Sequence, residues 1–261
     1  MAGRFDQLAP FFREVFGGRT HHGLWRYPDD SLEDALREME DFVIGRLAVS
    51  SGERVLDVGC GSGGIARRLA SMHGARVTGW DSSPAQIGQA GANDNAVFRC
   101  GDWMDNDLAD GSFDAALAIE SLEHMTDPVA ALREIARVLA PGGRLLIGSW
   151  SANRMDRRLD SIRRAGGLPG LLGTDEFLHA LRGAGFHVEN AVDLSERVAR
   201  TWTACLGRTL RVLPGSSALL RAVAGSPVLH GSMALAALRI RLAYQSGLLG
   251  YRSILARKPA V

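Results

Sequence analysis

Apolar and polar residues in the middle of the chain follow two alternating patterns. Short apolar runs predict strands, and segments with helical spacing lie between them. Strands that alternate with helices indicate a parallel sheet covered on both faces. The strands are expected near 54–58, 75–80, 96–100, 113–119 and 143–150, and the helices near 64–73, 84–92 and 128–139. Upstream, Ser31 is a good N-cap for a helix over 31–48.

The pattern becomes less regular after Trp150. A loop rich in glycine precedes a short helix that begins at Thr174 or Asp175, and residues 186–192 predict a sixth strand. Residues 195–247 are helical in pattern and precede a seventh strand near 248–256. We therefore expect a helical lid over 195–247 and an N-terminal lid segment over 1–30 that closes the same site. The core is expected over 31–194, with its final strand within 248–261.

Composition restricts the class of partner. The net charge is +1 with both signs interleaved, so we do not expect nucleic acid to be bound. The three cysteines fit neither a disulfide framework nor a metal pair, and no Cys/His cluster predicts a metal site. Arg239 and Arg241 interrupt the most apolar late stretch, so no membrane span is expected. We expect a cytoplasmic protein, monomeric or homodimeric, and its near-exclusive use of Arg over Lys suggests a bacterial source.

A glycine-rich turn is the most informative motif. Residues 55–64 read Val-Leu-Asp-Val-Gly-Cys-Gly-Ser-Gly-Gly, so an apolar strand runs into a turn with alternating glycines and then a helix. Glycines there permit close approach of a ligand, and the helix start offers unpaired N–H groups. Acidic residues follow the next strands: Asp81, Asp102 and, after the fourth strand, the segment Glu120-Ser-Leu-Glu-His-Met125. Ligands of open parallel sheets bind at the carboxyl ends of the strands, where these residues are expected.

This set of motifs resembles the class I S-adenosylmethionine-dependent methyltransferases, over most of the chain. Within them it is similar to the branch that contains sterol and tocopherol C-methyltransferases and bacterial natural-product methyltransferases. The resemblance implies an α/β fold with a Rossmann-like doubly wound sheet, mostly parallel with an antiparallel last strand, plus a helical lid. It also implies S-adenosyl-L-methionine as the cofactor and a small-molecule acceptor.

Site residues follow from the motifs and the resemblance together. Asp81 is expected to bind the ribose hydroxyls, and Asp102 the adenine amine, with Trp103 covering the ring. Asp57 either complements the amino end of the cofactor or satisfies local backbone donors. The remaining candidates for the cofactor are Gly59 and Gly61 of the turn, together with His22, Ser82, Gln86 and Ile119.

His124 is the best candidate base, because a neutral imidazole can take a proton near physiological pH. It can equally be a structural hydrogen-bonding residue at a helix start. Glu120 and Glu123 can hold a cationic acceptor or intermediate, or only cap the following helix. A non-methylating cyclisation or rearrangement, an NAD-dependent oxidoreductase and a non-catalytic binding protein remain alternatives. The acceptor and the atom methylated do not follow from the sequence.

Overall fold

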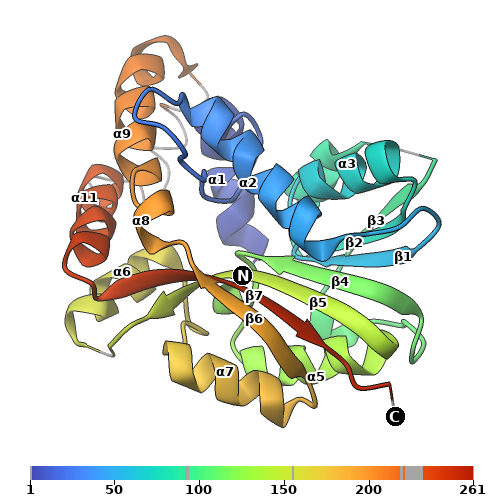
Figure 1. Cartoon of the computed structure of the whole chain (residues 1–261). Coiled ribbons are helices and arrows are strands. Elements are labelled where there is room, and N and C mark those ends of the chain that lie inside the picture. The colour runs from blue at the N-terminus through green and yellow to red at the C-terminus, as the bar shows by residue number, and fades with distance from the viewer. Residues whose placement is uncertain (1, 92–93, 155, 218–219, 221–231, 261) are drawn as a thin grey trace.

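The computed structural model describes residues 2–91, 94–154, 156–217, 220 and 232–260. Within them, seven strands form one sheet in the order β3-β2-β1-β4-β5-β7-β6 (Figure 1). The first five strands pair in parallel, and β7 is antiparallel to both β5 and β6. The predicted mostly parallel sheet with an antiparallel last strand is confirmed. The strands are β1 (Arg54–Val58), β2 (Arg76–Asp81), β3 (Ala96–Cys100), β4 (Phe113–Ile119), β5 (Leu139–Ala152), β6 (His187–Asp193) and β7 (Leu249–Arg257).

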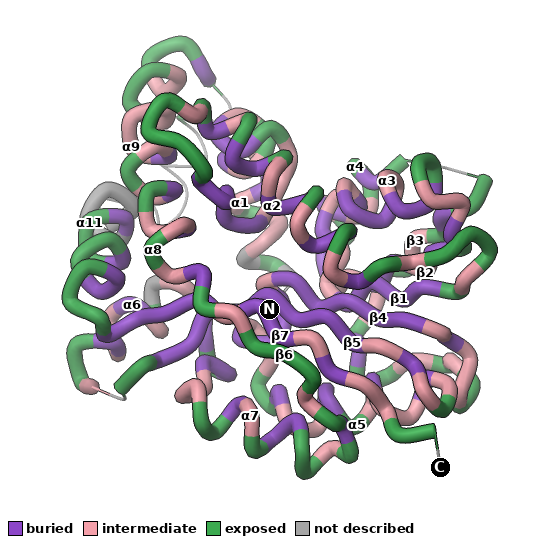
Figure 2. The backbone as a smooth tube through the Cα atoms, in the orientation of Figure 1, coloured by how far each residue is buried: buried purple, intermediate pink, exposed green. Residues whose placement is uncertain are grey.

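Side chains on the two faces of the sheet enter different cores, because successive residues of a strand point to opposite faces. In β1, Val55 joins a cluster with residues of α2 (Leu32–Leu47) and α3 (Gly64–His73). Leu56 joins a second cluster with residues of α5 (Pro128–Val138) and α7 (Thr174–Gly183). The central strands are buried along most of their length (Figure 2). Burial on both faces explains their continuous apolar runs.

The start of β5 differs from the prediction. We expected a turn at Pro141–Gly143 and a strand from 143, but β5 begins at Leu139. Its pairing with β4 shifts register between Phe113 and Ala115, where the strand accommodates extra residues as a bulge. The proline and glycines therefore lie within an irregular strand.

The N-terminal segment contains a helix that the sequence pattern did not predict, α1 (Ala2–Phe16). Phe11, Val15 and Phe16 of this helix pack in a third core cluster with Trp25 and with Cys205 of the lid. The helix also contacts α4 (Pro84–Ala90). Aromatic packing at a distance in sequence, rather than local periodicity, positions α1 next to the edge of the sheet.

Lid helices lie between β6 and β7 in the chain. Among the described residues they are α8 (Ser195–Val198), α9 (Thr201–Val212), the short 3-10 helix η3 (Leu213–Gly215) and α11 (Ser232–Gln245). α11 packs on α9, on α6 (Arg158–Gly166) and on β7. Residues 218–219 and 221–231 of the expected lid lie outside the described residues. In the described part of the chain, no helix has both the length and the apolar character needed to cross a membrane.

Candidate functional site

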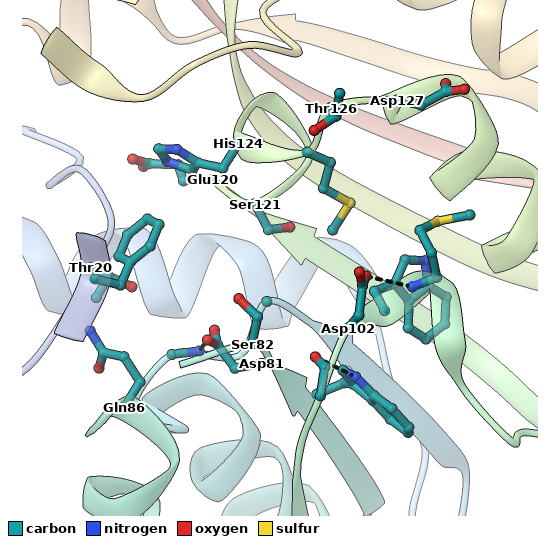
Figure 3. Close-up of a pocket in the computed structure, with 18 residues that line it drawn as sticks. Thr20, Asp81, Ser82, Gln86, Asp102, Glu120, Ser121, His124, Thr126 and Asp127 are labelled. Atoms are coloured by element: carbon teal, nitrogen blue, oxygen red, sulfur yellow. Dashed lines mark hydrogen bonds between the residues drawn. The ribbon is translucent and has the colours of Figure 1, made fainter. Parts of the chain in front are cut away.

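A cavity of about 580 Å³ lies where the chain leaves the carboxyl ends of β1, β2, β3 and β4. Figure 3 shows Asp81 and Ser82 after β2, Gln86 on α4, and Glu120 and Ser121 after β4 around this space. Phe5 of α1 and Thr20 complete the lining from the N-terminal segment. The motifs that the sequence singled out therefore meet in one cavity, because parallel strands end at the same edge.

The glycine turn makes this convergence sterically possible. Gly59, Gly61 and Gly63 have φ angles of 77°, 54° and 73°, which L side chains rarely adopt. A Cβ on Gly59 would lie 2.3 Å from the Cβ of Ser121, so the turns after β1 and β4 pack directly against each other. Only glycine fits at this contact.

Asp81 holds the turn in place. Its Oδ2 accepts the Gly61 N–H at 2.9 Å, and its Oδ1 accepts the Ser83 N–H at 2.8 Å. Burial raises the pKa of Asp81, and the two N–H donors counteract part of this rise. Each carboxylate oxygen accepts more than one hydrogen bond, so the group can also bind a ligand.

Asp102 follows the end of β3. Its Oδ1 accepts the Met104 N–H at 2.9 Å, which caps the 3-10 helix η1 (Trp103–Asp105). Asp102 itself is exposed, whereas the Trp103 ring is buried and packs edge-on to Trp80 with 6.2 Å between centroids. Both residues line the cavity.

Glu120 has an unusual backbone conformation and several hydrogen-bond donors around its carboxylate. Its φ is 51°, although it is not glycine, and its carboxylate accepts the backbone N–H of His22 at 2.6 Å. The carboxylate also accepts from His22 Nδ1 at 2.8 Å and from Trp150 Nε1 at 3.1 Å. Burial raises the pKa of Glu120, but its interactions with His22, which include the ring and backbone N–H donors, outweigh burial and lower the pKa to about 2. The cavity therefore has a fixed negative charge.

His22 positions Glu120 and is absent from the residues that line the cavity. Trp202 of the lid donates its indole N–H to His22 Nε2 at 2.8 Å. Because an indole N–H can only donate, Nε2 carries the lone pair and Nδ1 carries the proton that Glu120 accepts. The lid thus fixes the tautomer of the histidine that orients Glu120.

Glu123 points away from the cavity, into the core. Its carboxyl lies 3.0 Å from the Ser149 Oγ and accepts the Trp150 N–H at 3.2 Å. Burial, with the nearby charge of Glu120, raises the pKa of Glu123 to about 8. A protonated Glu123 connects the turn after β4 to β5, and it does not face the ligand space.

His124 does line the cavity. Its Nδ1 lies 2.8 Å from the Gly167 carbonyl oxygen, which can only accept, so Nδ1 carries a proton and, in the neutral ring, the lone pair is on Nε2. The ring packs edge-on to Phe5 of α1, with 5.0 Å between centroids. The orientation of the imidazole is therefore set by two elements outside its own turn.

A smaller cavity of about 30 Å³ adjoins the turn after β1 and shares Gly59 and Thr20 with the larger one. Asp57 and Ile119 line it. Burial, together with the charge of Asp81, raises the pKa of Asp57 to about 7. The other charged groups of this lining are Arg19, His21 and Glu40, of which Arg19 donates to Glu40 at 2.8 Å.

Sequence reasoning did not identify Phe5, Thr20, Arg19, His21 and Glu40 as site residues. They come from α1, from the loop that follows it and from α2, whose spacing indicates only packing. The aromatic residues of segment 1–30, Phe5 among them, were the one available signal, and they predicted that the segment closes the site without assigning a contact to any of them.

Two buried polar atoms of the larger cavity, Gln86 Nε2 and Ser121 Oγ, have no hydrogen-bond partner among the described residues. Such atoms are costly unless a ligand or water satisfies them, so the lining fits a polar, hydrogen-bonding ligand. In the same part of the chain, no group of three or more His, Cys, Asp or Glu residues is arranged to hold a metal ion.

Comparisons with known proteins identify the family. Residues 56–147 match the methyltransferase domain family. The 27-O-demethylrifamycin SV methyltransferase of Amycolatopsis mediterranei strain S699 is 35% identical over 211 residues, which cover 76% of this chain and 78% of that protein. The chloroplastic tocopherol O-methyltransferase of Arabidopsis thaliana is 31% identical over 290 residues, covering 98% and 80%.

A solved structure is similar over the whole chain. The crystal structure of the (4+2)-cyclase SpnF matches with a TM-score of 0.83 and 30% identity, covering 100% of this chain and 95% of that one. The family match and the relatives favour S-adenosylmethionine over NAD as the ligand of the glycine turn. The chain belongs to the S-adenosylmethionine-dependent methyltransferases.

Proposed function

We propose that the larger cavity binds the nucleoside of S-adenosylmethionine and presents its methyl group to a small, apolar or aromatic acceptor. Asp81 binds the ribose, and Asp102 binds the adenine amine beside Trp103. Ser82 and Gln86 border the nucleoside, where the cofactor satisfies the Gln86 amide. The two unsatisfied polar atoms of the lining support this placement.

The amino-acid end of the cofactor lies in the smaller cavity in this proposal. Asp57 faces the ammonium group of the cofactor there. Gly59 and Gly61 leave room for the part of the cofactor that runs between the two cavities. Ile119 provides an apolar wall. An adjacent cation favours the ionised form of a carboxylate whose pKa is raised to about 7, so binding would stabilise the charge on Asp57.

The cofactor supplies an electrophilic methyl group on a sulfonium, so the protein mainly has to orient the acceptor. In its neutral form, His124 takes a proton from the acceptor through Nε2. The observation that carries this role is the contact of Nδ1 with the Gly167 oxygen, which fixes the tautomer. Glu120, held ionised by His22, provides a negative charge beside the transfer point.

The acceptor belongs to secondary metabolism in this proposal. The relatives named above are a 27-O-demethylrifamycin SV methyltransferase and a tocopherol O-methyltransferase, and their names point to small-molecule acceptors. Phe5, Met104 and Met125 provide apolar lining. We further propose a bacterial, cytoplasmic enzyme, monomeric or homodimeric, without nucleic acid as a substrate.

His124→Ala tests the proposed base. Extract from cells that produce the protein is incubated with the enzyme and with cofactor that carries a deuterated methyl group. The labelled product is identified by mass spectrometry. Its formation is then measured with each variant. We expect His124→Ala to lower turnover by roughly 10²- to 10⁴-fold and to change the cofactor Kd by less than about threefold. The matched control is His187→Ala, which removes an exposed imidazole on β6. Equal turnover and equal pH profiles for the two variants would eliminate the base.

A second candidate function is cyclisation without methyl transfer. The similarity to the cyclase SpnF over the full chain supports this second function. The same labelling experiment separates the two functions. A cyclase would form an isomer of its substrate that contains no deuterium, and it would do so equally well with the demethylated cofactor.

A further inference from the structure

Charges are divided unequally along the chain. None of the 29 Asp and Glu residues lies after Glu196, whereas ten of the 30 Lys and Arg residues do. Residues 1–196 therefore carry a formal charge of −9, and residues 197–261 carry +10. The interleaving of charges that the net value of +1 suggested holds only for the first part.

The exposed face of α11 combines leucines with arginines. Ala237, Ile240, Ala243 and Tyr244 are buried, and the opposite side chains Leu238 and Leu242 are 46% and 53% exposed. At 3.6 residues per turn these leucines lie about 40° apart on the helix, with Arg241 on one side of them and Arg239 on the other. Both arginines are exposed. The helix is thus apolar on its inner face and has a central apolar strip, flanked by cations, on its outer face.

Neighbouring α9 continues this composition. Leu210 is 64% exposed, and Arg211 beside it is exposed as well. Among the described residues of 197–261, the arginines that form ion pairs are Arg252, with Asp193, and Arg257, with Glu189. The arginines of α9 and α11 therefore have no carboxylate partner in the described structure, and their charge is available to an external anion.

We propose that α9 and α11 bind the surface of an anionic lipid bilayer. A leucine strip flanked by arginines is the pattern of a helix that lies in the headgroup region, because the leucines enter the acyl boundary while the guanidinium groups reach lipid phosphates. The negative charge of residues 1–196 orients the molecule with the lid toward an anionic surface. Neither helix spans the bilayer, in keeping with the arginines on the exposed face.

Lipid fits this surface better than nucleic acid does. The aromatic rings of the two helices, Trp202 and Tyr244, are directed inward, where they pack with Trp150. The exposed leucines offer no stacking surface for bases, whereas acyl chains accept them. The proposal is independent of the methyl-transfer chemistry, because it concerns the outer face of the lid.

Vesicle co-sedimentation of the full chain tests it. We expect binding to vesicles of phosphatidylglycerol and phosphatidylcholine at 0.1 M salt, release at 1 M salt, and no binding to phosphatidylcholine alone. Arg239→Gln/Arg241→Gln should weaken binding roughly 10- to 30-fold. Leu238→Ser/Leu242→Ser should weaken it by at least tenfold. The control Arg133→Gln/Arg182→Gln removes the same charge from exposed positions of α5 and α7 and should bind like the wild type.

Four results would contradict binding of α9 and α11 to an anionic bilayer. Equal binding of the α11 variants and the control, or no binding to anionic vesicles, would overturn the proposal. So would a concentration-dependent dimer in sedimentation velocity that the leucine variant abolishes, because a second copy would then be the occupant of the face. Tighter binding of a DNA duplex than of the anionic vesicles would also overturn it. Circular dichroism and thermal unfolding confirm that each variant folds.

Discussion

At the scale of single residues, two acidic side chains of one short turn have different protonation states because their surroundings differ. Glu120 is met by N–H donors and keeps its charge, whereas the carboxyl of Glu123 is placed in the core with few donors and stays protonated. The segment Glu-Ser-Leu-Glu-His does not encode this difference. It arises from His22, Trp150 and Ser149, which are distant in sequence.

Glu123→Gln tests the protonated state of Glu123. The pKa of Glu123 is raised above its unfolded value of 4.5, so the folded state retains a proton that the unfolded state loses between pH 4.5 and 8. Stability is therefore greatest below the unfolded pKa and falls as pH rises toward the folded pKa. We expect the free energy of unfolding of the wild type to fall about 2 kcal/mol more than that of the variant between pH 5 and pH 7, measured by urea denaturation.

The control is Glu196→Gln, at an exposed position. It should follow the wild-type pH dependence. If Glu123→Gln also followed it, Glu123 would be ionised in the fold, and the connection between the turn and β5 would need another explanation.

At the scale of elements, the positions of strands and helices in the core were predictable. The apolar runs and the glycine turn depend on local chemistry, and the antiparallel last strand agreed with the family resemblance. The helix α1 and the bulge in β5 were not predictable, because both depend on partners elsewhere in the chain: α1 on the aromatic cluster with the lid, and the bulge on the register of β4.

The candidate site was predictable to a similar degree. Residues at strand ends, such as Asp81, Asp102 and His124, do line one cavity. His22 and Glu123 have contacts that no spacing reveals, and Arg19 and Glu40 become neighbours only when α2 packs on the sheet. The protein-wide arrangement, rather than the motif, determines which acid is charged.

Gly59→Ala tests the contact between the turns after β1 and β4. Both Gly59 and Gly52 have positive φ, but a Cβ at Gly59 would meet Ser121 at 2.3 Å, whereas a Cβ at Gly52 meets nothing within 4 Å. We expect Gly52→Ala to cost about 1 kcal/mol from backbone strain alone. Gly59→Ala should cost about 1–3 kcal/mol more and weaken cofactor binding at least tenfold.

Chemical denaturation and cofactor titration of the two variants provide the comparison. Similar losses of stability, with cofactor binding intact in Gly59→Ala, would mean that the two turns tolerate separation and that their contact does not shape the cavity.

At the scale of the whole molecule, the sheet places the site and the N- and C-terminal additions complete it. The α1 helix provides Phe5 to the cavity, and Asp6 Oδ1 accepts from Ser83 Oγ at 2.5 Å at the start of α4. The lid provides Trp202, which acts on Glu120 through His22. The helix α1 and the lid, which lie outside the motifs at the strand ends, thus control the charge and the walls of the cavity.

We propose that the glycine turn and Asp81 bind S-adenosylmethionine. Isothermal titration calorimetry of the full chain tests it most directly. We expect S-adenosylmethionine and its demethylated product to bind and NAD not to bind. Asp81→Ala should weaken binding of the first two by about 100-fold through loss of two hydrogen bonds to a charged group. Tighter binding of NAD, or unchanged cofactor binding by Asp81→Ala, would contradict it.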